Sequence, residues 1–301
     1  MKKIRAYLKG GLGNQCFIYA TARALAIRAG AELEFALDYF PEDSVYRRQF
    51  ELSVFNISGK ILDPSGWVRR KYITARGRIA SRLFKTARLG NFCCDHYPYT
   101  YYPLPEDWSG TLVLDGYWQS ENYYYGERTT LLEDFTLKNE SVLVGDMMAD
   151  KIRMNSCPVF IHMRSYDEVP VGTGAIPVGM EFYEKAIATL RERIGDGMTL
   201  FLFSDNLQWA ENRICGISAA RGLALVVVEP SGTASFPSEI RDFMLMQMCH
   251  HGIVANSSFS RFAAWLGEQR NIATGRNPIY VHNSRKKNGY CPDRWLRIEA
   301  D

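Results

Sequence analysis

The chain has 301 residues, a hydrophobic content of 47%, a charged content of 23% and a formal net charge of +3. This composition is ordinary for a globular protein of one or two domains, and so small a charge gives no support for nucleic-acid binding. The seven cysteines form no C-x-x-C pair, which argues against a zinc site or a disulfide framework and favours a reducing compartment. The aromatic content, 13%, fits either a well-filled core or a protein that stacks on sugars.

The first elements in chain order are a strand over residues 3–8, a helix over residues 15–29 with an apolar stripe, and a second strand in "ELEFALD". The charged Arg5 and Lys9 interrupt the apolar run that a signal peptide needs, so we expect this stretch to be part of the mature fold. The turn between strand and helix, "GGLGNQ", lacks the third glycine of the dinucleotide-binding pattern G-x-G-x-x-G.

Glycines nevertheless let a backbone approach a ligand, and the N–H groups at a helix N-terminus bind anions. Gly11, Gly13, Asn14 and Gln15 are therefore candidate ligand-binding residues. The alternative is a simple hinge in which Asn14 caps the helix.

Residues 69–88, "RRKYITARGRIASRLFKTAR", predict a basic amphipathic helix. Such a helix either contacts an anionic membrane surface or is an ordinary solvated face. The stretch "GTLVLDGYWQSENYYY" predicts a buried strand followed by an aromatic loop.

From about residue 156 apolar strands alternate with amphipathic helices. The predicted strands are "PVFIHM", "MTLFLFS", "ALVVVE", "GIVAN" and "PIYV", and the predicted helices span 180–194, 207–214, 237–250 and 259–269. This alternation predicts an α/β fold with a parallel sheet covered on both faces. The polar segment "GDMMADKIRMNSC" indicates a boundary between two domains, 1–150 and 151–301, with a C-terminal tail that packs back on the first domain.

Ligands of parallel sheets bind beyond the carboxyl ends of the strands. After "PVFI" comes "HMRSYDE", where His162 and Arg164 lie on the same side of the strand by alternation and Asp167 follows. An arginine here can bind a phosphate, and the carboxylate can orient that arginine or act as a base. A salt-bridged surface turn is the alternative.

Two further strand ends carry polar residues. Ser204 and Asp205 can bind a ribose hydroxyl or the donor edge of a base, or can serve as an ordinary helix cap. The segment from Asn256 through Ser257 and Ser258 to Phe259 begins a helix whose N-terminus can bind a pyrophosphate.

Several chemistries have no motif in the chain. The sequence has no P-loop, no D-x-D pair that would bind a divalent cation, no G-x-S-x-G elbow, and no histidines spaced as metal ligands. We therefore expect a phosphate site built from arginine, backbone amides and hydroxyls, with no metal and no cofactor.

Five motifs, "GGLGNQ-F-YA", "DGYWQSENYY", "HMRSYD", "FSDNLQW" and "DFMLMQMCHHGIVANSSFSRFAAWL", occur in an order that resembles glycosyltransferase family 11, the α-1,2-fucosyltransferases. The resemblance implies a GT-B fold, in which two Rossmann-like domains face a cleft, with the acceptor on the N-terminal domain and GDP-fucose on the C-terminal one. It also implies metal-independent, inverting transfer from GDP-β-L-fucose to the 2-hydroxyl of a terminal β-galactose.

Within the family motif H-x-R-R-x-D, His162, Arg164 and Asp167 match and are the expected catalytic residues, whereas Ser165 replaces the second arginine. The resemblance implies that Arg164 binds the β-phosphate of the donor. Asp167 is the first candidate for the general base and Glu168 the second, and either carboxylate can instead orient Arg164. We expect the missing second arginine to matter little, because one arginine is enough to hold a phosphate.

The tyrosine-rich loop, with Tyr117, Trp118 and Gln119, is the expected acceptor wall. The expected acceptor is a galactose-terminated oligosaccharide or lipid-linked glycan, made for O-antigen or lipopolysaccharide by a cytoplasmic enzyme that is peripheral at the inner membrane through residues 69–88. The alternatives are a different regiochemistry, another GDP-sugar donor, or a non-catalytic GDP-sugar or glycan-binding protein.

Overall fold

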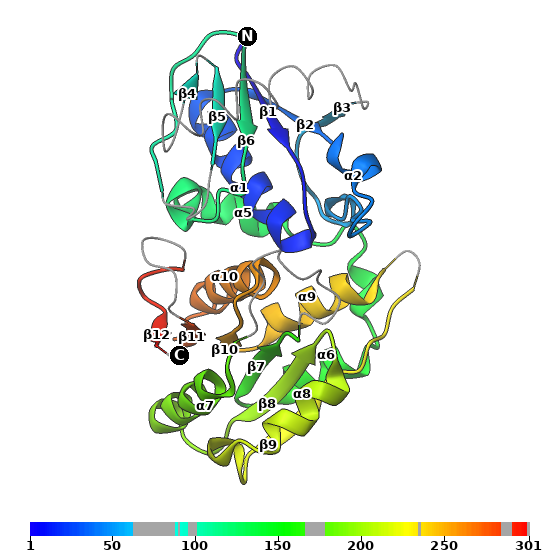
Figure 1. Ribbon diagram of the computed structural model, residues 1–301, viewed down its shortest axis with the longest axis vertical. Coiled ribbons are helices and arrows are strands. Elements are labelled where there is room, and N and C mark those ends of the chain that lie inside the picture. Colours follow the sequence, from blue (N-terminus) through cyan, green and yellow to red (C-terminus); the bar gives the residue numbers. More distant parts are fainter. Residues whose placement is uncertain are drawn as a thin grey trace. The chain divides into compact units, whose positions relative to one another are not determined.

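The computed structural model describes residues 1–62, 88–89, 91–95, 101–165, 178–233, 236–283 and 291–299 (Figure 1). The chain divides into two compact units, the first comprising Met1–Lys138 and Asn288–Pro292 and the second Asn139–Lys287 and Asp293–Asp301. Residues 69–87 of the predicted basic helix lie outside the described residues.

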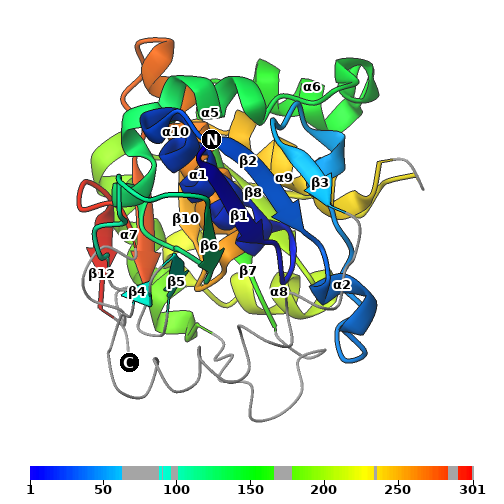
Figure 2. The same cartoon turned by 90° about the horizontal axis from the view of Figure 1, so that it is seen from above.

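The first unit is built on a six-stranded sheet. Its strand order is β3 (Lys60–Leu62), β2 (Glu32–Ala36), β1 (Lys3–Tyr7), β6 (Thr111–Asp115), β5 (Phe92–Cys94) and β4 (Arg88–Leu89). All neighbours are parallel except β4 and β5. Strand β1 therefore lies between β2 and β6, as Figures 1 and 2 both show. The shorter helical elements are α2 (Tyr39–Glu42), η1 (Leu52–Val54), η3 (Glu121–Tyr123), η4 (Tyr125–Glu127) and α5 (Arg128–Asp134).

Helix α1 (Leu12–Ala29) connects β1 to β2 and is the long helix of this unit. Its buried positions include Cys16, Ile18 and Thr21 as well as the expected apolar stripe, so the helix is buried on most of its circumference. The helix ends at Gly30, whose φ of 59° is the left-handed conformation that glycine adopts without strain. Burial of this kind fixes the position of the turn that precedes the helix.

The second unit has a six-stranded sheet in which every pair is parallel. Its order is β12 (Leu296–Ile298), β11 (Tyr280–Asn283), β10 (His251–Val254), β7 (Pro158–Met163), β8 (Thr199–Ser204) and β9 (Ala224–Val227). Numbered from β7, this is the Rossmann order 3-2-1-4-5-6. The helical elements are η5 (Glu140–Leu143), α6 (Met147–Met154), α7 (Met180–Ile194), α8 (Leu207–Ile214), η6 (Ser218–Ala220), α9 (Ser238–Met248) and α10 (Ser258–Ala273).

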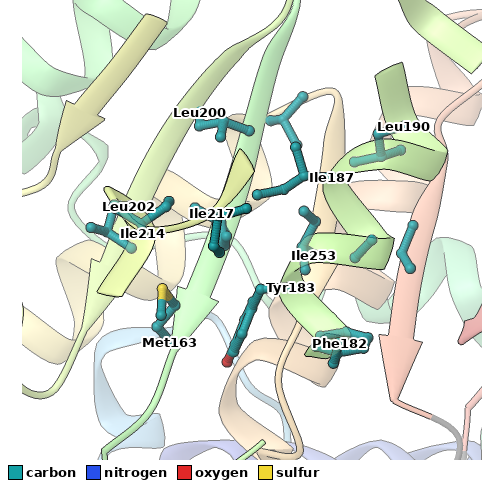
Figure 3. Close-up of a cluster of buried hydrophobic side chains, with 14 of the residues drawn as sticks. Met163, Phe182, Tyr183, Ile187, Leu190, Leu200, Leu202, Ile214, Ile217 and Ile253 are labelled. Atoms are coloured by element: carbon teal, nitrogen blue, oxygen red, sulfur yellow. The ribbon is translucent and has the colours of Figure 1, made fainter. Parts of the chain in front are cut away.

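The two faces of this sheet pack against different helices. On one face, Ile161 and Met163 of β7 join a buried cluster with side chains of α7 and α8, which Figure 3 shows with α7 against the strands. Side chains alternate along a strand, so Phe160 and His162 point to the opposite face. There Phe160 contacts Tyr280 and the His162 ring lies 5.9 Å from that of Phe259 on α10.

The segment before β7 is anchored to the second unit. Asp146 caps α6 by accepting hydrogen bonds from Met148 N and Ala149 N, and its carboxylate also accepts from Arg241 Nε on α9 at 2.6 Å. This buried ion pair holds α6 (residues 147–154) on α9.

Candidate functional site

In the second unit the strand order reverses between β7 and β10, and ligands of parallel sheets bind beyond the carboxyl ends of the strands at such a point. Arg164 and Ser165 follow β7, and Asn256 and Ser257 follow β10. Strand β8, the other neighbour of β7, ends at Ser204 and is followed by Asp205. The fold thus brings three of the predicted polar strand ends to one edge of one sheet.

Arg164 is oriented by Asp205. Its Nε lies 3.5 Å from Asp205 Oδ2, and the other carboxylate oxygen accepts a hydrogen bond from the Ser165 backbone N–H at 2.8 Å. The Arg164 side chain keeps a quarter of its surface exposed, while its Nε is buried. Asp205, predicted to bind the donor directly, thus contacts the arginine and the serine that stands in for the second motif arginine.

His162 is buried on the α10 side of β7, and its backbone carbonyl accepts a hydrogen bond from the Tyr183 hydroxyl at 3.1 Å. Burial, reinforced by the charge of Arg164, lowers the pKa of His162 to about 3. The imidazole is therefore neutral at working pH and is a poor proton acceptor. Its Nδ1 has no hydrogen-bond partner among the described residues, which leaves a neutral, hydrogen-bonding or positioning role.

The turn after β8 is closed by its own residues. The Ser204 hydroxyl accepts from Asn206 N and donates to Asn206 O, both at 3.0 Å, and Asn206 caps α8 by accepting from Trp209 N. The residue that caps the helix is therefore Asn206, and neither Ser204 nor Asp205 is the cap. The Ser204 hydroxyl already has two hydrogen-bond partners within the turn.

Helix α10 begins at the same edge with a regular cap. Ser257 is the N-cap and its hydroxyl accepts from Phe259 N at 3.3 Å, while the side chains of Asn256 and Ser258 are half-buried. The first-turn amides and the helix dipole favour a negative charge at this position.

A second arginine near this edge, Arg261, was not among the residues predicted from the sequence. Arg261 lies on α10 and is 2% exposed. Burial, together with the charges of Arg261 and Arg297, lowers the pKa of His282 on β11 to about 4. The sequence signal that could have revealed Arg261 is its position between the capped "NSSFS" turn and the apolar run "FAAWL".

In the first unit, hydrogen bonds of buried side chains fix the glycine turn between β1 and α1. Helix α1 begins after Gly11, which has no side-chain cap, so Asn14 is not the cap. Asn14 Oδ1 instead accepts from Gln119 Nε2 at 2.7 Å, while Gly13 is buried inside α1. Gln15, fully buried, donates to the carbonyls of Gly10 and Gln49, so its amide fixes the turn and is not exposed to a ligand.

The residues of the predicted acceptor loop differ in burial. Trp118 is 2% exposed and packs edge-on against Tyr123, with ring centroids 5.6 Å apart. Its φ of 51° is in the left-handed region, and its backbone N–H donates to Asp95 Oδ2 at 2.7 Å. Tyr117 is half-buried, whereas Trp118 contributes to the framework and offers little surface to a sugar.

Some predicted features are outside the part of the chain that the structure describes. Asp167 and Glu168, the base candidates, are among them. Within the described ranges, no group of three or more His, Cys, Asp or Glu side chains could hold a metal ion. In the same ranges we find no helix whose length and apolar character would allow it to cross a bilayer.

Comparison with known families decides the class of the protein. The model of glycosyl transferase family 11 matches residues 99–298. The chain belongs to glycosyl transferase family 11. The predicted family and the predicted enzyme class, a glycosyltransferase, are thereby confirmed.

Two bacterial relatives match this family 11 chain over nearly its whole length, and a mammalian one matches part of it. An α-1,2-colitosyltransferase of Escherichia coli is 26% identical over 99% of this chain and 100% of its own. The O-antigen biosynthesis glycosyltransferase WbnK of Escherichia coli is 28% identical over 97% and 99%. The galactoside α-(1,2)-fucosyltransferase 2 of Sus scrofa is 28% identical over 62% of this chain and 56% of its own.

Solved structures show the fold of the family 11 chain. A mutant of Arabidopsis thaliana FUT1 in complex with GDP matches with a TM-score of 0.55 and 13% identity, covering 97% of this chain and 72% of that one. Fucosyltransferase NodZ from Bradyrhizobium matches with a TM-score of 0.51 and 14% identity, covering 87% and 92%. The predicted fold class, α/β of the GT-B type with two Rossmann-like units, is confirmed.

Proposed function

We propose that this family 11 enzyme transfers L-fucose from GDP-β-L-fucose to the 2-hydroxyl of a terminal β-galactose. The observation that carries the donor side is Arg164, a partly exposed side chain paired with Asp205 at the reversal point of a Rossmann-type sheet. The N-terminus of α10 begins at the same edge. A diphosphate is the ligand that matches an arginine beside a helix N-terminus.

The proposed reaction is a single in-line displacement with inversion. The acceptor oxygen forms a bond to C1 of fucose while the bond from C1 to the β-phosphate oxygen breaks, and the acceptor proton passes to a carboxylate. Arg164 and the α10 amides stabilise the negative charge on the departing GDP, for which one fixed donor is worth about 10²–10³ in rate. Asp167 is the proposed base and Glu168 the second candidate.

Ser204, Asp205, Asn256, Ser257, Ser258 and Phe259 form the proposed donor surface of the second unit, in which Asp205 acts through Arg164. In the first unit we assign the donor-side contacts to the backbone of Gly11 and to Asn14, while the buried Gly13 and Gln15 fix the turn. No metal takes part in this proposal, because the charge of the leaving group is offset by arginine and amides.

The test is an assay of the purified protein with GDP-fucose and a panel of β-galactosides, in the presence of EDTA, followed by linkage analysis of the product. We expect an α-1,2-fucosylated product that forms at an undiminished rate when EDTA is present. A product with another linkage would contradict the regiochemistry, and loss of activity that Mg²⁺ or Mn²⁺ restores would contradict metal independence.

A second donor deserves the same assay, since the named full-length relative with 26% identity is a colitosyltransferase. Colitose differs from fucose by lacking the 3-hydroxyl, so a site that hydrogen-bonds this hydroxyl rejects colitose strongly, whereas an apolar site tolerates both. Equal kcat/KM for GDP-fucose and GDP-colitose would replace our donor assignment with a broader one.

The proposed role is in the assembly of a cell-surface glycan, the process named for the WbnK relative. We place the enzyme in the cytoplasm, peripheral at the inner membrane through residues 69–88. Sedimentation with vesicles of increasing anionic lipid content tests this placement, and binding that does not depend on that content would contradict it.

A further inference from the structure

The edge of the first sheet carries an ion pair at its own reversal point. The strand order of this unit reverses between β1 and β6. Lys9 follows β1, Asp115 is the last residue of β6, and Lys9 Nζ lies 2.6 Å from Asp115 Oδ1. These two side chains thus occupy the position at which a parallel sheet binds its ligand.

Both members of the pair are partly exposed. The side chain of Lys9 is 24% exposed and that of Asp115 is 13% exposed. Lys9 Nζ also lies 5.0 Å above the ring of Tyr117, so the ammonium group contacts a carboxylate and the face of an aromatic ring at once.

The loop that carries Tyr117 is rigidly held on both sides of that residue. A Cβ on Gly116 would lie 2.3 Å from Asp95 Cβ, so the backbone approaches Asp95 more closely than any other residue type permits. Trp118 is buried with a left-handed backbone and its N–H donates to Asp95, and Gln119 donates to Asn14. Backbone strain of this kind is characteristic of preorganised sites.

The arrangement matches a neutral sugar. A hydroxyl can donate to Asp115 and another can accept from Lys9, while the C–H face of the ring packs on an aromatic side chain. An anionic ligand is disfavoured at this position, because the Asp115 carboxylate would repel it. The donor diphosphate therefore does not explain the pair, whereas a galactoside does.

We propose that Lys9 and Asp115, together with Tyr117, bind the terminal sugar of the acceptor, with Trp118 serving only to hold the loop. This inference rests on the proposed function, since it names the residues that recognise the neutral substrate. It extends the predicted acceptor wall by an ion pair and removes one aromatic residue from it.

The test is Asp115→Asn, which preserves shape and removes the charge. With lactose as acceptor we expect KM for lactose to rise at least tenfold, while KM for GDP-fucose and the affinity for GDP change less than twofold. The matched control is Asp107→Asn, because Asp107 pairs with Lys2 at 3.3 Å in the same unit and its side chain is 98% exposed. We expect the control to behave as wild type.

An unchanged KM for lactose in Asp115→Asn, or an equal loss of GDP affinity, would overturn the inference. Should Asp115→Asn fail to fold, Lys9→Met and Tyr117→Leu provide the same readout. Failure of the proposed function is distinguishable, since wild type would then form no fucosylated product and would not bind GDP.

Discussion

Each unit has a six-stranded sheet with a reversal point, but the two sheets differ in the order of their outer strands and in the charge at that point. In the first unit the side chains there satisfy one another: Lys9 pairs with Asp115, and Asn14 bonds with Gln119. In the second unit Arg164 and the α10 N-terminus outweigh the single carboxylate of Asp205. One sheet thus ends in a neutral edge, which fits the proposed sugar, and the other in a positive edge, which fits the proposed diphosphate.

The largest effect is expected when the positive charge at the sheet edge of the second unit is removed. We expect Arg164→Ala to lower kcat by about 10²–10³, because the charge on the leaving group loses a fixed donor. Initial rates at saturating GDP-fucose measure this loss. Arg213→Ala is the control, since Arg213 is an exposed arginine of the same unit that stacks on Trp209; equal losses in both variants would remove Arg164 from the site.

A buried carboxyl in the second unit makes the stability of that unit depend on pH. Burial raises the pKa of Asp242 on α9 to about 7, although Arg241 opposes the rise and Glu239 and Asp146 add to it. The folded state therefore binds a proton that the unfolded state releases near pH 4, so this group costs stability progressively as pH rises from about 4 to 7.

Asp242→Asn removes that cost. We expect the free energy of unfolding of the variant, measured with urea, to exceed that of wild type by on the order of 2 kcal/mol between pH 5 and pH 8. This difference should grow toward pH 8. A gain that is independent of pH would show that the carboxyl does not titrate in this range.

The neutral edge can be tested through its backbone. Gly116→Ala places a methyl group against Asp95, so we expect a loss of about 1–3 kcal/mol in stability together with a raised KM for the acceptor. Gly126→Ala is the matched control, because a Cβ there meets nothing within 4 Å. Thermal unfolding of both variants gives the answer, and equal midpoints would contradict the close packing at Gly116.

The smallest expected effect concerns the partner of Arg164. Asp205→Asn keeps the hydrogen bond from Ser165 N possible but removes the charge that orients the guanidinium, so we expect roughly a tenfold rise in the KM for GDP-fucose. A rise in the KM for the acceptor alone would mean that Asp205 does not act through Arg164.

The sequence predicted most elements of the second unit, although not α6 or β12. Apolar runs alternating with amphipathic segments placed α7 and α8 at their observed bounds, and α10 is extended at both ends by its Ser257 cap and by a longer last turn. Arg164 was identified because a strand end in a parallel sheet is a recognisable position. Periodicity is local, so it is visible in one sequence.

Contacts between distant residues could not be predicted. Asp205 orients Arg164 from the next strand, and Gln15 bonds with the carbonyl of Gln49, 34 residues away. Trp118 was assigned to the acceptor wall from its composition and place, whereas the bond to Asp95 turns its side chain into the interior. Such pairings depend on strand order, which hydrophobic patterns do not encode.

The framework around Tyr117 has a consequence for the evolution and engineering of specificity. The close approach of Gly116 to Asp95 and the bond from Trp118 N–H to Asp95 hold the backbone on both sides of position 117. If Tyr117 binds the acceptor as proposed, a library at this one position is expected to sample different sugar preferences on a backbone that its neighbours hold. A family of transferases can diversify its acceptors in this way without risking the fold.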